Sequence, residues 1–148
     1  MNPTWSVRVR TESKGTSVAY ARNHRISAGP PLSFEPKDAL PCGIELMLAA
    51  LGADILYNLS ALLSKKRIEI DDAELTLTCR LQNALAHLGV IGEEGAPYAE
   101  SIEGVLYLAA SPSASELEAL LAESLTKAPT YLTLARATKI SLRLAKTG

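Results

Sequence analysis

Hydrophobic and polar residues alternate along four segments of the chain, a pattern typical of strands that turn one face toward a core. These segments are residues 5–10, 17–21, 74–81 and 101–108. The first two flank a turn at Gly15 and predict a half-buried hairpin, whose second strand could run on as far as Ile26. In the fourth segment we expect Ile102, Val105 and Tyr107 to be the apolar members.

A long apolar stretch between the strands predicts the central helix. Residues 43–66 are mostly strong helix formers, and a basic run at their end suits the helix dipole. The stretch is apolar nearly all round, as expected for a helix packed on several sides. Its polar positions Glu45, Asp54 and Asn58 favour a buried helix of a soluble protein over a membrane span.

A second helix is predicted near the C-terminus. Ser113 and Glu116 have the spacing of a capping box, and the amphipathic pattern that follows should end near Lys127. Pro129 prevents easy continuation of this helix, so residues 131–135 are expected to form at most a short further turn.

The order of elements indicates an α+β fold with a largely antiparallel sheet, in a single domain over residues 1–148. Residues 138–144 should form the last strand. The proline-rich stretch 29–41 predicts an irregular connection, and the glycines of 84–95 predict a mobile loop. Because a monomer would have trouble covering so apolar a helix, we expect a second subunit to help bury it.

The composition limits which binding partners, cofactors and cellular location we expect for the protein. The 148 residues carry a net charge of −1, which gives no reason to expect nucleic acid or an anionic membrane as a partner. The first residues lack the basic and apolar regions of a signal peptide, so we expect a cytoplasmic protein. Two cysteines and the isolated His24 and His87 have no metal-ligand spacing, and no phosphate-binding glycine loop is present, so no metal or cofactor is expected.

Two motifs give the chain a family resemblance. Residues 45–54, Glu-Leu-Met-Leu-Ala-Ala-Leu-Gly-Ala-Asp, resemble the run that opens the central helix of OsmC/Ohr proteins, and residues 123–131 resemble that family's second signature. Shorter stretches that also fit are 22–25, 71–72 and 97–98. The resemblance implies the OsmC-like fold, an intertwined homodimer, and reduction of organic hydroperoxides by a pair of cysteines, assisted by an Arg and a Glu.

The sequence departs from the family where that chemistry takes place. Asp54 stands at the position of the first cysteine and Ala128 at that of the second. The reaction needs a thiolate that becomes a sulfenic acid and a second thiol that resolves it, and neither a carboxylate nor a methyl group can replace them. The two losses together suggest a changed role.

The candidate pocket consists of residues from the stretches that resemble the family. They are Asp54, Glu45, Arg22, Arg25, His24, Ala128 and Tyr131. Asp54 could pair with an arginine, bind a ligand or act as a general base, or it could belong to a polar stripe with Asn58. Glu45 matches the motif's glutamate, although it could simply complement the helix dipole. Arg22 is preferred to Arg25 as the family's arginine, and each of the other candidates could be an ordinary surface or core residue.

Three functional hypotheses follow. The first is a small-molecule-binding or regulatory module that uses the pocket at the dimer interface, with a small apolar ligand. The second is a hydroperoxide reductase acting through Cys42, although Cys42 lies twelve residues before Asp54, about 18 Å along a helix. The third is an acid/base hydrolase built on Asp54. Cys79 alternates with leucines and is expected to face the core.

Overall fold

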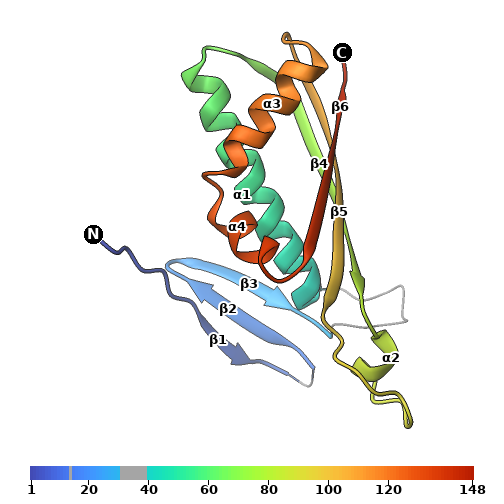
Figure 1. Ribbon diagram of the computed structural model, residues 1–148. Coiled ribbons are helices and arrows are strands. Elements are labelled where there is room, and N and C mark those ends of the chain that lie inside the picture. Colours follow the sequence, from blue (N-terminus) through green and yellow to red (C-terminus); the bar gives the residue numbers. More distant parts are fainter. Residues whose placement is uncertain (14, 31–39) are drawn as a thin grey trace. The chain divides into compact units, whose positions relative to one another are not determined.

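The computed structural model describes residues 1–13, 15–30 and 40–148, which form two compact units, Met1–Met47 and Leu48–Gly148. The elements in chain order are β1 (Arg8–Thr11), β2 (Ser17–Ala21), β3 (His24–Ala28), α1 (Gly43–Lys65), β4 (Ile70–Leu81), α2 (Ala84–His87), β5 (Ala99–Ala110), α3 (Ala114–Leu125), α4 (Pro129–Ala135) and β6 (Lys139–Lys146). Helix α1 begins at the end of the first unit and continues through the second (Figure 1).

The first unit contains a three-stranded antiparallel sheet in the order β1-β2-β3. The predicted hairpin is confirmed, but the second strand does not run on to Ile26. The chain turns instead at Arg22 and Asn23, so that Ala21 pairs with His24. Arg22 takes a left-handed conformation, with φ 55°, as a two-residue hairpin turn requires. This turn could not be predicted from the sequence because no glycine occupies it.

One face of this sheet carries an apolar row that is partly exposed. Val9, Ala19 and Ile26 form a row across the three strands. The side chains of Val9 and Ile26 are 59% and 44% exposed. Strand β1 begins only at Arg8 and is exposed throughout, so the expected half-buried strand from residue 5 is wrong in its start and in its burial within one chain. The predicted irregular connection over 29–41 lies mostly outside the described residues.

The second unit contains a three-stranded sheet in the order β4-β5-β6. Strands β4 and β5 are antiparallel, whereas β5 and β6 are parallel. The expectation of a largely antiparallel sheet therefore fails at this pair. Helices α3 and α4 connect β5 to β6, and such a crossover returns the chain to the same end of the sheet, which makes the two strands parallel.

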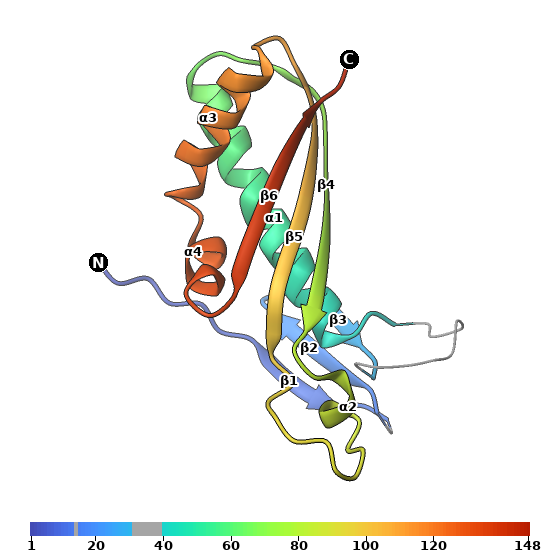
Figure 2. The same ribbon diagram turned by 45° about the vertical axis from the view of Figure 1, so that its right-hand side comes forward.

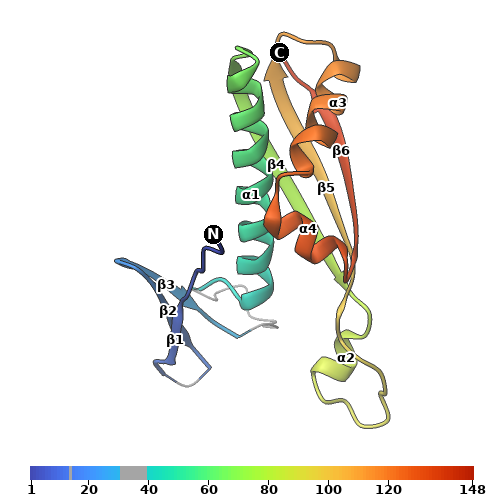
Figure 3. The same cartoon turned by 60° about the vertical axis from the view of Figure 1, so that its left-hand side comes forward.

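Helices α1, α3 and α4 cover one face of this sheet (Figures 1 and 3). The largest fully buried side chains are mainly leucine and isoleucine. They are Leu51, Ile55, Leu59, Leu63, Ile102, Leu106, Leu108, Leu117 and Ser124. The four on α1 recur every fourth residue and form a single stripe, so α1, although apolar nearly all round, buries only one side within the chain.

Two glycines allow close approach in this core. A Cβ at Gly104 on β5 would lie 2.7 Å from a Leu142 methyl and 2.8 Å from a Leu77 methyl. A Cβ at Gly52 would lie 3.4 Å from Leu77, which shows how closely α1 approaches β4. By length and composition α1 is also apolar enough to cross a membrane, so its polar residues do not by themselves exclude a span.

Strand β5 is longer than predicted. Two of the three residues expected to be its apolar members lie on the less buried face of the strand. Its buried positions alternate from Ile102 through Leu106 to Ala110, whereas Val105 and Tyr107 belong to the other face. The expected loop over 84–95 contains α2, a single turn capped by the side chain of Asn83 (Figure 2). The capping box of Ser113 and Glu116 is confirmed at the start of α3.

Candidate functional site

Asp54 of α1 makes a contact between segments far apart in the sequence. Its Oδ2 accepts a hydrogen bond of 2.8 Å from the backbone N–H of Thr130, which lies 76 residues later. Its Oδ1 accepts a second bond of 3.0 Å from the side-chain amide of Asn58, one turn further along α1. The side chain is half-buried. Both carboxylate oxygens therefore have protein partners, and the cost of placing the charge among apolar residues is offset.

This contact caps the N-terminus of α4. The cap residue is Ala128, whose methyl group cannot accept a hydrogen bond, and Pro129 occupies the first helical position. A cap side chain normally accepts from the second or third N–H of the helix, and Thr130 is the second residue of α4. Asp54 thus supplies, from α1, the acceptor that Ala128 lacks, and its negative charge also suits the helix N-terminus.

The structure brings together the two positions at which the family's cysteines are expected. Ala128 is fully buried and lies two residues before the N–H that Asp54 binds. Tyr131, also predicted for the pocket, follows next on α4 and is half-buried. Asn58 and Thr130 were not predicted as partners of Asp54. The only sequence signals were the four-residue spacing to Asn58 and a helix start with alanine at the cap.

Glu45 has a clear local role at the other end of α1. Its Oε1 accepts a hydrogen bond of 3.0 Å from the backbone N–H of Cys42, the residue before the helix. That backbone bond, with a smaller contribution from the Cys42 thiol, lowers the pKa of Glu45 below its ordinary value. Glu45 therefore acts as the glutamate of a capping arrangement, in agreement with the simpler of the two interpretations of this residue.

The basic candidates lie in the first unit. Arg25 on β3 makes an ion pair of 2.6 Å with Glu12, and its guanidinium lies 5.9 Å from the centre of the Tyr20 ring. Arg22 is exposed at the hairpin turn, and His24 is exposed on β3. Among the described residues Arg22 has no ion pair, and the preference for Arg22 over Arg25 as the family's arginine stays a prediction. A role for any of these three beside Asp54 stays a prediction.

The two cysteines are both free, and neither is well exposed. Cys42 is buried, with 7% of its surface exposed. Cys79 is half-buried on β4, and burial raises the pKa of its thiol. A raised pKa leaves less of the reactive thiolate at neutral pH. The prediction that Cys79 faces inward is consistent with its position among the half-buried residues of β4.

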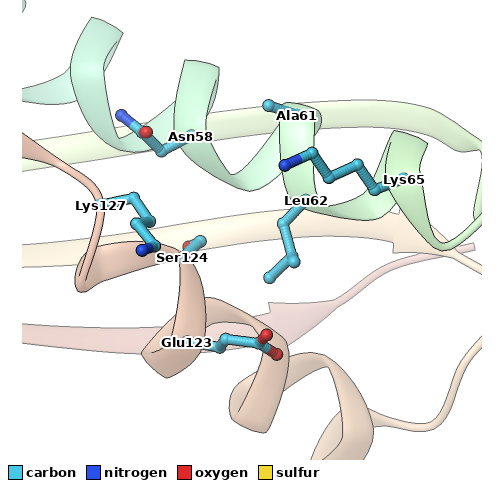
Figure 4. A pocket seen from close by; sticks show the side chains of 7 residues that line it. All are labelled: Asn58, Ala61, Leu62, Lys65, Glu123, Ser124 and Lys127. Carbon is cyan, nitrogen blue, oxygen red and sulfur yellow. The ribbon is translucent and has the colours of Figure 1, made fainter.

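A cleft opens along α1 beyond Asn58. It has a volume of about 450 Å³ and is lined from α1 and from the end of α3 and the turn after it. Its lining residues are Asn58, Ala61, Leu62, Lys65, Glu123, Ser124 and Lys127 (Figure 4). None of them was among the predicted pocket residues. Within the part of the chain that the structure describes, no group of His, Cys, Asp and Glu could hold a metal ion.

Comparison with known proteins supports the resemblance. The family model described as OsmC-like protein matches residues 36–143. An OsmC-like protein from Mycoplasma pneumoniae has a similar structure, with a TM-score of 0.84, 14% identity and full coverage of both chains. An OsmC-like protein of unknown function from Vibrio cholerae matches with a TM-score of 0.80 and 12% identity, over 97% of this chain and 100% of that one.

This chain is also similar to a solved structure whose name states a function. An organic hydroperoxide resistance protein from Elizabethkingia anophelis matches with a TM-score of 0.70 and 10% identity, over 99% of this chain and 100% of that one. Among curated proteins, none matches. At these identities the structures establish the fold alone. The family model, which covers most of the chain, establishes more: the chain belongs to the family of OsmC-like proteins.

Proposed function

We propose that this chain is a member of the family that does not act as a thiol peroxidase and instead serves as a small-molecule-binding or regulatory module. The observation that carries the proposal is the bond from Thr130 to Asp54. At the two positions where the resemblance places a reactive and a resolving thiol, a carboxylate caps a helix that starts at an alanine. On this proposal, a structural hydrogen bond takes the place of the family's redox pair.

The chemistry supports this proposal. In the thiol cycle a thiolate attacks the O–O bond of the hydroperoxide, which releases an alcohol and leaves a sulfenic acid. A second thiol then displaces water to form a disulfide. Asp54 cannot be oxidised in this way, and Ala128 offers no sulfur to the second step.

The two other hypotheses are less well supported. A reductase acting through Cys42 would need that buried thiol to meet a peroxide and then a resolving partner. An acid/base enzyme built on Asp54 would need its carboxylate to meet a substrate, whereas its hydrogen bonds engage both oxygens with protein groups of α1 and α4.

A homodimer forms part of the proposal. The first unit carries the exposed apolar row of Val9 and Ile26, and the second unit separately has an apolar groove of about 310 Å³ between α1 and β4. Its lining residues are Leu48, Ala49, Gly52, Ala53, Leu56, Leu75 and Leu77. Exposed apolar surfaces of this kind are typical of interfaces between subunits. Sedimentation equilibrium should therefore report about twice the chain mass of 15.8 kDa.

A charge in the groove tests this assembly. Ala53 is exposed within one chain, so Ala53→Glu should leave the fold intact but weaken the dimer, since a subunit seated on the groove would bury the new carboxylate. Ser60→Glu, at an exposed position of α1 outside the groove, is the matched control. A wild-type monomer, or equal effects of the two variants, would contradict the dimer.

The absence of peroxidase activity is tested with the purified wild-type protein. We expect cumene hydroperoxide to be consumed with dithiothreitol no faster than in the absence of protein. Fast consumption that is lost in Cys42→Ser would overturn the proposal in favour of the Cys42 reductase. Fast consumption that survives this change but is lost in Cys79→Ser would overturn it in favour of Cys79.

A further inference from the structure

The cleft between α1 and the end of α3 has unused cationic groups. Lys65 enters it from the last turn of α1, and Lys127 enters it from the turn after α3 (Figure 4). Glu123 also lines the cleft. Among the described residues, however, neither lysine has an acidic group within 4.0 Å, because the only ion pair there joins Arg25 to Glu12. Among the residues that the structure describes, the cleft therefore carries two ammonium groups without an ion pair, together with the carboxylate of Glu123.

The side chains of Asn58 and Ser124, which also line the cleft, already donate hydrogen bonds to protein oxygens. The side-chain amide of Asn58 donates to Asp54 twice, to the backbone oxygen at 2.8 Å and to Oδ1 at 3.0 Å. The hydroxyl of the buried Ser124 donates to the backbone oxygen of Leu121 at 2.7 Å. A bound molecule would consequently find donors only on the two lysines, while Asn58 retains an oxygen that can accept.

The rest of the lining is aliphatic. Ala61 and Leu62 of α1 are half-buried, and the long stems of both lysines add methylene groups. A volume of about 450 Å³ falls within the range of about 300–1,000 Å³ that is usual for small-molecule sites. The cleft thus combines aliphatic groups with two cationic groups and one carboxylate.

We propose that this cleft binds a small amphiphilic anion, a molecule with an apolar body against Leu62 and a carboxylate head between Lys65 and Lys127. This inference rests on the proposed function, a binding module, and names the site and the chemical class of its ligand. It also places the ligand site one helical turn beyond Asp54, since Asn58 both bonds to that carboxylate and lines the cleft.

Three probes of equal chain length separate the effect of charge from that of apolar contact. Octanoate, 1-octanol and octylammonium are titrated into the full-length protein, and amide chemical shifts are followed by NMR. Octanoate should bind at least tenfold more tightly than octylammonium, with shifts at Ala61, Leu62 and Ser124, and its binding should weaken as salt is added. Octanol should bind at the same amides with lower affinity.

The lysines are tested with a matched control. Lys65→Gln with Lys127→Gln should lower octanoate affinity at least fivefold and leave octanol affinity unchanged. Lys66→Gln, which removes a neighbouring exposed lysine outside the cleft, should change neither. Because all three lysines are exposed, these variants should fold, and circular dichroism checks this.

The site would be overturned by octanoate binding no tighter than octylammonium, by an unchanged affinity in the double variant, or by shifts confined to the groove between α1 and β4. None of these binding results would show that the protein has peroxidase activity. Failure of the ligand site is therefore distinguishable from failure of the proposed function, which the peroxide assay decides.

Discussion

Replacing Asp54 by alanine tests whether its carboxylate holds α4 in place. The change removes two hydrogen bonds to a charged acceptor, one from the Thr130 N–H and one from the Asn58 amide. Bonds of this kind contribute about 1.5–3 kcal/mol each, and the lower value suits a half-buried site. Alanine recovers about 0.5 kcal/mol because it is a better helix former than aspartate. We expect the free energy of unfolding to fall by about 2.5 kcal/mol.

The assay is urea unfolding at fixed protein concentration, since dimerisation would make stability depend on concentration. For a chain of this size a loss of about 2.5 kcal/mol corresponds to a fall of roughly 5–10 °C in Tm. Asp54→Asn should cost about half as much, because its amide oxygen can still accept from Thr130 but its NH₂ group cannot accept from Asn58.

A matched control removes a carboxylate without such partners. Glu118 is exposed on α3, and Glu118→Ala should change the free energy of unfolding by less than about 0.5 kcal/mol. If Asp54→Ala were as mild as this control, Asp54 would not be a helix cap and the structural reason for its presence would be refuted.

Two further predictions concern other parts of the fold. Gly104→Ala should lower the free energy of unfolding by about 1–3 kcal/mol in urea unfolding, because the added methyl would overlap the side chains of Leu77 and Leu142; an unchanged stability would mean that those leucines move aside freely. Glu45 has a lowered pKa in the folded protein, so its stabilising contribution is present above its ordinary value of 4.5 and is lost as the pH falls below that value. Compared with Glu45→Gln, the wild type should therefore lose more stability in urea unfolding between pH 6 and about pH 3, and parallel pH profiles would contradict the bond to Cys42.

Much of the fold could be predicted because local signals and burial agree there. The capping box at Ser113 fixes the start of α3, and the run of helix formers gives both ends of α1 to within a residue. The turn at Arg22 and the parallel pairing of β6 could not be predicted in this way. The turn lacks glycine, and the direction of β6 depends on where the chain returns to the sheet.

The candidate site could be predicted only at the level of residue identity. The motifs single out Asp54 and Ala128, but periodicity cannot show that the carboxylate of one meets the helix start that follows the other. That contact joins two residues 76 positions apart in the sequence and arises from the packing of α4 against α1. The cleft with Lys65 and Lys127 was missed for the same reason, since its sides come from two separate segments.

The central claim, that Asp54 and Ala128 occupy the places of a redox pair, is tested most directly by restoring the two thiols. The measurement is peptide mapping of Asp54→Cys with Ala128→Cys after one equivalent of cumene hydroperoxide, with Cys42 and Cys79 replaced by serine. The account predicts a disulfide within one chain between positions 54 and 128, with consumption of the hydroperoxide when dithiothreitol is supplied. Two thiols that stay reduced or pair only between chains would contradict it.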